Sequence, residues 1–116
     1  MARVTTTAPL LPTADETLAF AATLARAIDG EVDTGARRRA EYATDASNYR
    51  IVPQLVAYPR DADDLLAALA AARQSRMPVT MRGGGTSVAG NAIGPGLVLD
   101  VSRHMNRILD VDVEAR

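Results

Sequence analysis

A glycine-rich stretch between residues 78 and 91 carries the residue types best suited to binding chemistry in this chain. It begins as a short apolar run and breaks into three consecutive glycines, followed by small hydroxyl residues. A β-branched run that turns abruptly into glycine is typical of a strand entering a tight loop. Glycine lets a ligand approach the backbone, and successive N–H groups can converge on an anion. The stretch predicts a cradle for a pyrophosphate, with candidate binding residues Arg82, Gly83, Gly84, Gly85, Thr86, Ser87, Val88, Gly90 and Asn91.

Two common phosphate-binding motifs do not fit this stretch. Gly85 and Gly90 have P-loop spacing, but Asn91 stands where the lysine is required, and all 13 basic residues of the chain are arginine. Gly83 and Gly85 match the start of the dinucleotide fingerprint, whose third glycine is replaced by Val88. A nucleoside triphosphatase is therefore not expected.

The residues instead resemble a known family. Residues 82–91 resemble the pyrophosphate loop of the FAD-binding domain shared by p-cresol methylhydroxylase, vanillyl-alcohol oxidase and FAD-linked D-2-hydroxyacid dehydrogenases. The segment that enters that domain is resembled by residues 42–47. Its first strand is resembled by residues 56–59, and the strand after the loop by residues 97–102. Residues 102–106 are most similar to bacterial D-lactate or D-2-hydroxyglutarate dehydrogenases that carry an iron–sulphur region. The resemblance covers residues 40–116.

The resemblance implies an α/β (α+β) fold, namely the first lobe of a p-cresol-methylhydroxylase-type FAD-binding domain. It implies a small, mostly parallel sheet with flanking helices, preceded by an N-terminal helix. FAD should be non-covalent, because Thr86 stands where some relatives attach it through a histidine. The parent would oxidise a D-2-hydroxy acid such as D-lactate, glycolate or D-2-hydroxyglutarate. Its remaining domains would supply the catalytic residues and any iron–sulphur cluster, so this chain alone should be inactive.

The N-terminal part is expected to contain a flexible leader over residues 1–12 and a helical preface over residues 13–49. Thr13 and Glu16 have the spacing of a capping box. A helical apolar face follows and should end near Gly30; its members are Leu18, Ala21, Ala22, Leu24, Ala25 and Ile28.

Residues 50–116 are expected to form the lobe itself. Strands are predicted at 55–58, 79–82 and 97–101, with the first two parallel if the intervening helix is a right-handed crossover. Asp61 should cap that helix, whose predicted buried stripe is Leu65, Leu66, Leu69 and Ala72.

The C-terminal residues 109–115 alternate apolar and acidic side chains, which predicts a strand with one buried face. Because no closing element follows, we expect the domain to be truncated before a second lobe. The exposed edge of this strand is a candidate for self-association.

Other polar residues favour structural roles. The Arg37–Arg39 cluster is typical of a solvated turn or helix end, with a phosphate or domain contact as the alternative. Asp61, Asp63 and Asp64 suit a helix start rather than a metal, and His104 has no identified acidic partner. No catalytic or metal-binding residue is predicted, and Asp45 is a minor candidate for the cofactor site.

Length, composition and net charge indicate what class of protein this is. A length of 116 residues with 47% hydrophobic content suits one aliphatic domain. A net charge of −1 gives no general attraction to nucleic acid or anionic membranes. The absence of cysteine excludes disulfides, and no apolar run approaches the roughly 20 residues that span a bilayer. We expect a cytoplasmic protein, with peripheral membrane attachment through the parent's electron acceptor left open.

Two other functions remain open from the residues alone. The chain could be a non-enzymatic α/β interaction module whose glycine loop is a turn, or a domain that binds another nucleotide. The first predicts no flavin or ADP binding, and competition among FAD, ADP and NAD separates the second.

Overall fold

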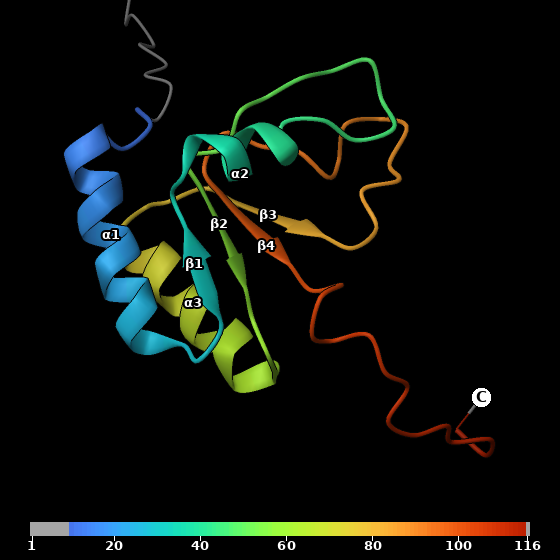
Figure 1. The fold of residues 1–116 in the computed structure, drawn as a ribbon. Coiled ribbons are helices and arrows are strands. Elements are labelled where there is room, and N and C mark those ends of the chain that lie inside the picture. The colour runs from blue at the N-terminus through green and yellow to red at the C-terminus, as the bar shows by residue number, and fades with distance from the viewer. Residues whose placement is uncertain (1–9, 116) are drawn as a thin grey trace, which may run out of the picture.

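The computed structural model describes residues 10–115. Most of the predicted leader therefore lies outside the described residues, and residues 10–12 have no regular structure. Three helices and four strands follow one another along the chain (Figure 1). They are α1 (Ala14–Ala27), β1 (Glu31–Asp33), α2 (Ala36–Glu41), β2 (Leu55–Tyr58), α3 (Ala62–Gln74), β3 (Val79–Arg82) and β4 (Leu97–Asp100). The predicted helices and the strands β2 and β3 are confirmed, and β4 ends one residue before the predicted Val101.

The four strands form one sheet in the order β1-β2-β4-β3. Strand β4 pairs in parallel with β2 on one side and with β3 on the other, so β2 and β3 are parallel without being neighbours. Strand β1 pairs antiparallel with β2. The sheet is small and mostly parallel, as predicted, and the carboxyl ends of β2, β3 and β4 meet at one edge.

Both long helices begin with the predicted side-chain caps. Thr13 accepts a hydrogen bond from the amide of Glu16, while the Glu16 carboxylate accepts one from the amide of Thr13. The Asp61 carboxylate accepts from the amide of Asp64 at 2.9 Å. These bonds satisfy N–H groups that have no partner within the first helical turn, which fixes where α1 and α3 start.

One face of the sheet packs against α1 and α3 to make the main core. Strands β2 and β4 are buried on both faces, because alternate side chains point to opposite sides. Leu55, Ala57, Leu97 and Leu99 join the core with helix residues that include Phe20, Leu24, Ala68 and Ala72. On the opposite face, Val56, Tyr58 and Val98 form a smaller cluster against Tyr42 at the end of α2.

The predicted strand over residues 109–115 is wrong. No strand is assigned there, and the side chains of Leu109 and Val111 are 88% and 69% exposed. An alternating pattern becomes a strand only when a neighbour supplies its hydrogen bonds, and no described strand pairs with this segment. It runs away from the sheet in Figure 1. The self-association predicted at its edge therefore has no preformed strand in this structure.

The predicted buried stripe of α3 is only partly correct. Ala72 is buried and Leu65 partly buried, but Leu66 is 65% exposed and Leu69 is also exposed. Asp64 and Ala68 are buried in their place, because α1 crosses α3 closely and small side chains suit that contact. In α1, similarly, Leu18, Ala22 and Ala25 are exposed, whereas Thr17 and Phe20 are buried.

Strand β1 was not predicted from the sequence; it lies within the predicted helical preface and joins the sheet. A buried carboxylate holds it in place. Asp64 accepts hydrogen bonds from the amides of Asp29, Gly30 and Arg60 at 2.9, 2.9 and 3.0 Å.

Across residues 10–115, no helix is both long enough and apolar enough to cross a bilayer.

Candidate functional site

The glycine loop leaves the carboxyl end of β3 and returns to the sheet as β4. Arg82 is the last residue of β3, and its carbonyl accepts a hydrogen bond from the amide of Val101 at 3.0 Å. The loop therefore lies at the edge where the parallel strands end, which is where open α/β sheets bind ligands. In Figure 1 it forms the orange-brown connection beyond β3.

The first two glycines face open space. A Cβ added at Gly83 would meet no atom within 4 Å, and one at Gly84 would meet only the Thr86 methyl at 3.5 Å. Neither residue has positive φ, so nothing within residues 10–115 requires glycine at these positions. Within that range, the amide N–H groups of residues 83–88 also donate no hydrogen bond. The loop thus presents free donors behind an unobstructed surface, which fits a phosphate group.

The other two loop glycines have structural roles. Gly85 has φ of +69°, and its missing Cβ would lie 2.5 Å from the Arg82 guanidinium. Gly90 has φ of +82°, and a Cβ there would lie 3.0 Å from the ring of Tyr49. Both conformations are ones that L side chains rarely adopt. These two glycines let the loop turn against its neighbours.

The side chain of Arg82 supports the loop by bonding to backbone carbonyls on both sides of it. Its Nη1 donates to the carbonyl of Thr44 at 2.9 Å and to that of Ala92 at 3.2 Å. Its guanidinium carbon also lies 4.9 Å from the centre of the Tyr42 ring. Arg82 is one of the candidate binding residues predicted from the sequence, and the structure gives it hydrogen bonds to the backbone on both sides of the loop.

Ser87 holds the second half of the loop through its side-chain oxygen, and its hydroxyl hydrogen has no partner in the loop. Its Oγ accepts hydrogen bonds from the amides of Ala89 and Asn91 at 3.3 and 3.1 Å. A hydroxyl has two acceptor positions and one hydrogen, so its hydrogen remains available to a ligand. The side chains of Thr86, Val88 and Asn91 are exposed along the same loop, and those of Thr86 and Asn91 make no hydrogen bond within residues 10–115.

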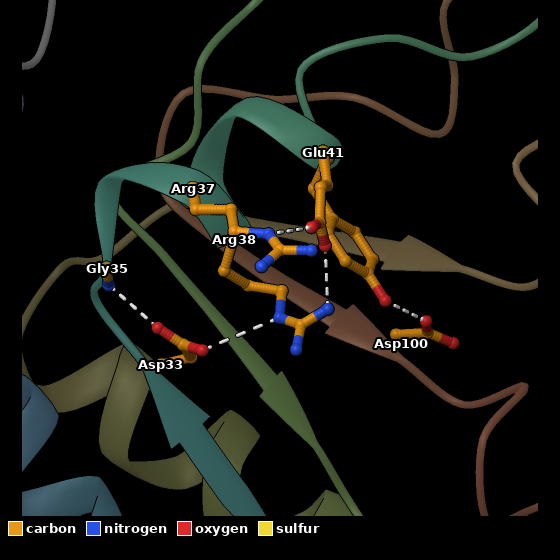
Figure 2. Close-up of polar contacts among 7 residues, drawn as sticks. Asp33, Gly35, Arg37, Arg38, Glu41 and Asp100 are labelled. Atoms are coloured by element: carbon orange, nitrogen blue, oxygen red, sulfur yellow. Dashed lines mark hydrogen bonds and ion pairs between the residues drawn. The ribbon is translucent and has the colours of Figure 1, made fainter.

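The arginine cluster on α2 has local partners (Figure 2). Arg37 and Arg38 both pair with Glu41, at 3.1 and 2.7 Å, and Arg38 also reaches Asp33 at 3.5 Å. Arg39 donates to the carbonyl of Pro53 at 2.7 Å. These contacts give the cluster a structural role around a short helix, in line with the local interpretation made from the sequence.

A tyrosine–aspartate contact joins α2 to the sheet. The hydroxyl of Tyr42 donates to Asp100 at the end of β4, which is the dashed contact at Asp100 in Figure 2. Asp100 also accepts a hydrogen bond from the amide of Ser102 at 2.8 Å. Burial raises the pKa of Tyr42, and the bond to Asp100 raises it further, so the phenol stays protonated. The ring of Tyr58 lies at 6.0 Å from that of Tyr42, and Arg103 stacks on Tyr58 at 3.8 Å. These contacts could not be predicted from the sequence, because they join segments far apart in the chain.

His104 has an acidic partner that the sequence did not reveal. Its Nε2 lies 2.9 Å from a carboxylate oxygen of Glu31 in β1. The hydrogen bond from His104 is the main cause that lowers the pKa of Glu31. The pair ties the segment after β4 to the start of β1 and is consistent with a structural role. Among the described residues, no group of three acidic or histidine side chains is arranged to hold a metal ion.

Comparison with known proteins adds a family and a fold. A family model described as "FAD binding domain" matches residues 53–116. The D-2-hydroxyglutarate dehydrogenase of Pantoea ananatis is 41% identical over 103 residues, covering 85% of this chain and 10% of that protein. The enzyme of the same name from Escherichia coli is 42% identical over 88 residues, covering 73% and 9%. This chain spans about a tenth of the length of these curated relatives.

Further likeness is found to a shorter relative and to solved structures. The glycolate oxidase subunit GlcD of Bacillus subtilis is 37% identical over 79 residues, covering 66% of this chain and 17% of that protein. The structure of 4-ethylphenol oxidase from Gulosibacter chungangensis has a TM-score of 0.67 at 17% identity, covering 89% of this chain and 22% of that one. That of p-cresol methylhydroxylase also has 0.67, at 15% identity, covering 90% and 22%. The structural likeness confirms the fold class predicted from the sequence.

Proposed function

This chain belongs to the FAD binding domain family, and from that premise we propose that residues 82–91 hold the pyrophosphate of FAD. The observation that carries the proposal is the pair Gly83 and Gly84. These residues have no steric reason to be glycine within residues 10–115, and a ligand lying against their backbone would supply one. The free amides of residues 83–88 lie on the same stretch.

Each part of the loop has a distinct task in this proposal. The amides of residues 83–88 and the hydroxyl of Ser87 donate to phosphate oxygens. Thr86 and Asn91 supply further side-chain donors, and Val88 and Gly90 contribute backbone. Arg82 holds the loop in shape and adds positive charge behind it. Hydrogen bonds to a charged group contribute about 1.5–3 kcal/mol each, so a few of them bind a pyrophosphate firmly.

We further propose that the parent protein oxidises a D-2-hydroxy acid. The support is the identity of 41–42% to D-2-hydroxyglutarate dehydrogenases and of 37% to a glycolate oxidase subunit. Bound FAD supplies the hydride acceptor, while residues of this chain bind and orient it. Residues 50–116 would form the first lobe of the FAD domain, residues 13–49 its preface, and the relatives' additional length the substrate site. An iron–sulphur cluster stays a prediction for the parent, because this chain has no cysteine.

The proposal is tested by titrating the chain with FAD and following the quenching of flavin fluorescence. We expect saturable quenching that ADP reverses, because the loop would bind the pyrophosphate in the ADP half of FAD. Since NAD contains the same ADP half, only tighter binding of NAD than of FAD would favour a domain for another nucleotide. Absence of binding both here and in a version extended with the following domain would favour a structural turn and contradict the proposal.

A second expectation concerns how FAD is held. Thr86 has no side-chain nitrogen to attach a flavin, so we predict that FAD is bound to this segment non-covalently. Acid precipitation of the FAD-loaded parent should leave the yellow colour in the supernatant. Flavin that stays with the pellet and maps by mass spectrometry to a peptide containing residues 82–91 would contradict this prediction.

A further inference from the structure

We propose that residues 42–50 form a clamp that holds the glycine loop in its binding conformation before FAD arrives. The proposal rests on the function proposed above and extends it to residues outside the family match, which begins at residue 53. Asp45 is the main positioning residue of this clamp segment. In Figure 1 the green connection after α2 lies beside the orange-brown glycine loop.

The end of the loop is held by hydrogen bonds to the amide and the carbonyl of Ala92. The Asp45 carboxylate accepts a hydrogen bond from the amide of Ala92 at 3.2 Å. On the other side, Arg82 donates to the carbonyl of Ala92 at 3.2 Å and to that of Thr44 in the clamp segment at 2.9 Å. Ala92 is itself buried. The loop is thus tied at its start by Arg82 and at its end by Asp45.

The clamp segment is internally ordered, so it can hold another segment. Thr44 and Arg50 form an antiparallel bridge, and the amide of Ile51 donates to the carbonyl of Ala43 at 2.9 Å. The second oxygen of Asp45 accepts from the amide of Ser47 at 2.9 Å, and Ser47 Oγ accepts from the amide of Tyr49 at 3.1 Å. Ala43 is fully buried. At the front of the segment, Tyr42 bonds to Asp100 in β4.

Steric contact adds to these bonds. Gly90 adopts positive φ, and a Cβ there would lie 3.0 Å from the ring of Tyr49. Glycine at this position lets the clamp segment and the loop pack together. Glycine in the loop therefore has two different uses: Gly83 and Gly84 leave room for a ligand, and Gly90 leaves room for the clamp segment.

The chemistry of Asp45 indicates that it acts through Ala92 rather than on the phosphate. An ionised carboxylate only accepts hydrogen bonds, so it cannot donate to a phosphate and would repel one. Hydrogen bonds from Ser47, in the first place, lower the pKa of Asp45, which keeps it an acceptor near neutral pH. The negative charge of Asp45 near the proposed phosphate site is therefore explained by its hydrogen bond to the backbone of Ala92.

The benefit of a clamp is that the loop does not need to be ordered on binding. The loop amides of residues 83–88 have no internal partners, so an unclamped loop would sample many conformations. When only a fraction of molecules has the competent loop, the apparent dissociation constant rises by the inverse of that fraction. A competent population of about 10% would weaken binding about tenfold.

The test compares Asp45→Ala with Asn48→Ala, a change in the same segment at an exposed side chain that makes no hydrogen bond within residues 10–115. ADP affinity is measured by calorimetry, and amide hydrogen exchange is followed for Asn91, Ala92 and the core strand β4. We expect Asp45→Ala to weaken ADP binding about tenfold and to speed exchange at Asn91 and Ala92 but not in β4. Saturating ADP should restore the slow exchange, which a merely structural lesion would not show. Asn48→Ala should behave as the wild type.

The two proposals fail in different ways. Unchanged ADP affinity and unchanged exchange in Asp45→Ala would overturn the clamp while leaving the phosphate cradle intact. If the wild type does not bind ADP but Asp45→Ala still speeds exchange at Ala92, the cradle fails and the ordering role of Asp45 stands.

Discussion

Gly84→Val is expected to abolish the binding of ADP and FAD while leaving the fold intact. The valine side chain would fill the open space in front of the free amides of residues 83–88, where only the Thr86 methyl lies nearby. Losing two hydrogen bonds to a charged phosphate removes about 3 kcal/mol or more, which corresponds to an affinity loss of at least about 100-fold. Calorimetric titration with ADP measures the loss.

Ala89→Val is the matched control for Gly84→Val. It adds β-branched bulk to the same loop at another exposed residue, beyond the free amides, and should change ADP affinity little. Because Gly84 does not have positive φ, thermal unfolding of Gly84→Val should resemble that of the wild type. Retained affinity in a folded Gly84→Val variant would show that no ligand lies against the backbone there, and the proposed cradle would be wrong.

Asp64→Ala is expected to lower the free energy of unfolding by about 3–6 kcal/mol, since three amides lose an acceptor at about 1–2 kcal/mol each or more. Asp64 is only 5% exposed and receives the amides of Asp29, Gly30 and Arg60. These bonds connect the end of α1, the start of β1 and the start of α3. Small domains have total stabilities of about 5–15 kcal/mol, so this variant should lose a large part of its stability. Urea denaturation followed by circular dichroism measures the change.

Two comparisons show whether the carboxylate of Asp64 is responsible. Asp63→Ala removes a neighbouring acid that is exposed in the same helical turn, and should cost only about 0.3–1 kcal/mol through the helix dipole. Asp64→Asn keeps one acceptor oxygen and should lie between the wild type and Asp64→Ala. If Asp63→Ala destabilises as much as Asp64→Ala, the loss would come from the helix start in general.

The same carboxylate gives a pH dependence with a defined sign. Burial opposes ionisation of Asp64, but the three backbone hydrogen bonds outweigh it and lower its pKa. A carboxyl whose folded pKa is lowered stabilises the protein above its unfolded pKa of about 3.9. That contribution disappears as pH falls through the folded pKa. The stability difference between the wild type and Asp64→Ala should therefore be full near pH 7 and shrink below about pH 4.

Elements that depend on local residues could be predicted from the sequence. The capping box at Thr13, the cap at Asp61 and the apolar runs of β2 and β3 each depend on residues within one or two turns, and all were predicted correctly. The glycine loop was equally visible, because adjacent glycines after a strand mark a turn or loop. That this loop binds FAD is a proposal that came from the resemblance, and the match of residues 53–116 to an FAD binding domain supports it.

Other features depended on which distant segments meet. Strand β1 has only three residues and is stabilised by β2 and by Asp64, neither of which its own sequence reveals. The reverse case is residues 109–115, whose alternating pattern is clear but which have no partner strand among the described residues. The α3 stripe differed for the same reason, since α1 packs on the side of α3 that carries Ala68 and leaves the larger Leu66 and Leu69 exposed.

Within the site, the sequence determined the donors and the tertiary structure determined how they are held. Gly83 and Gly84 were recognisable as glycines, yet only their surroundings show that the space before them is free. Arg82 bonds to residues on both sides of the loop, and Asp45 is a positioning residue, because Asp45 and Ala92 meet although they are 47 positions apart in the sequence. Local sequence sets backbone preference and chemistry over a few residues, whereas contacts between remote segments arise only when the whole core packs.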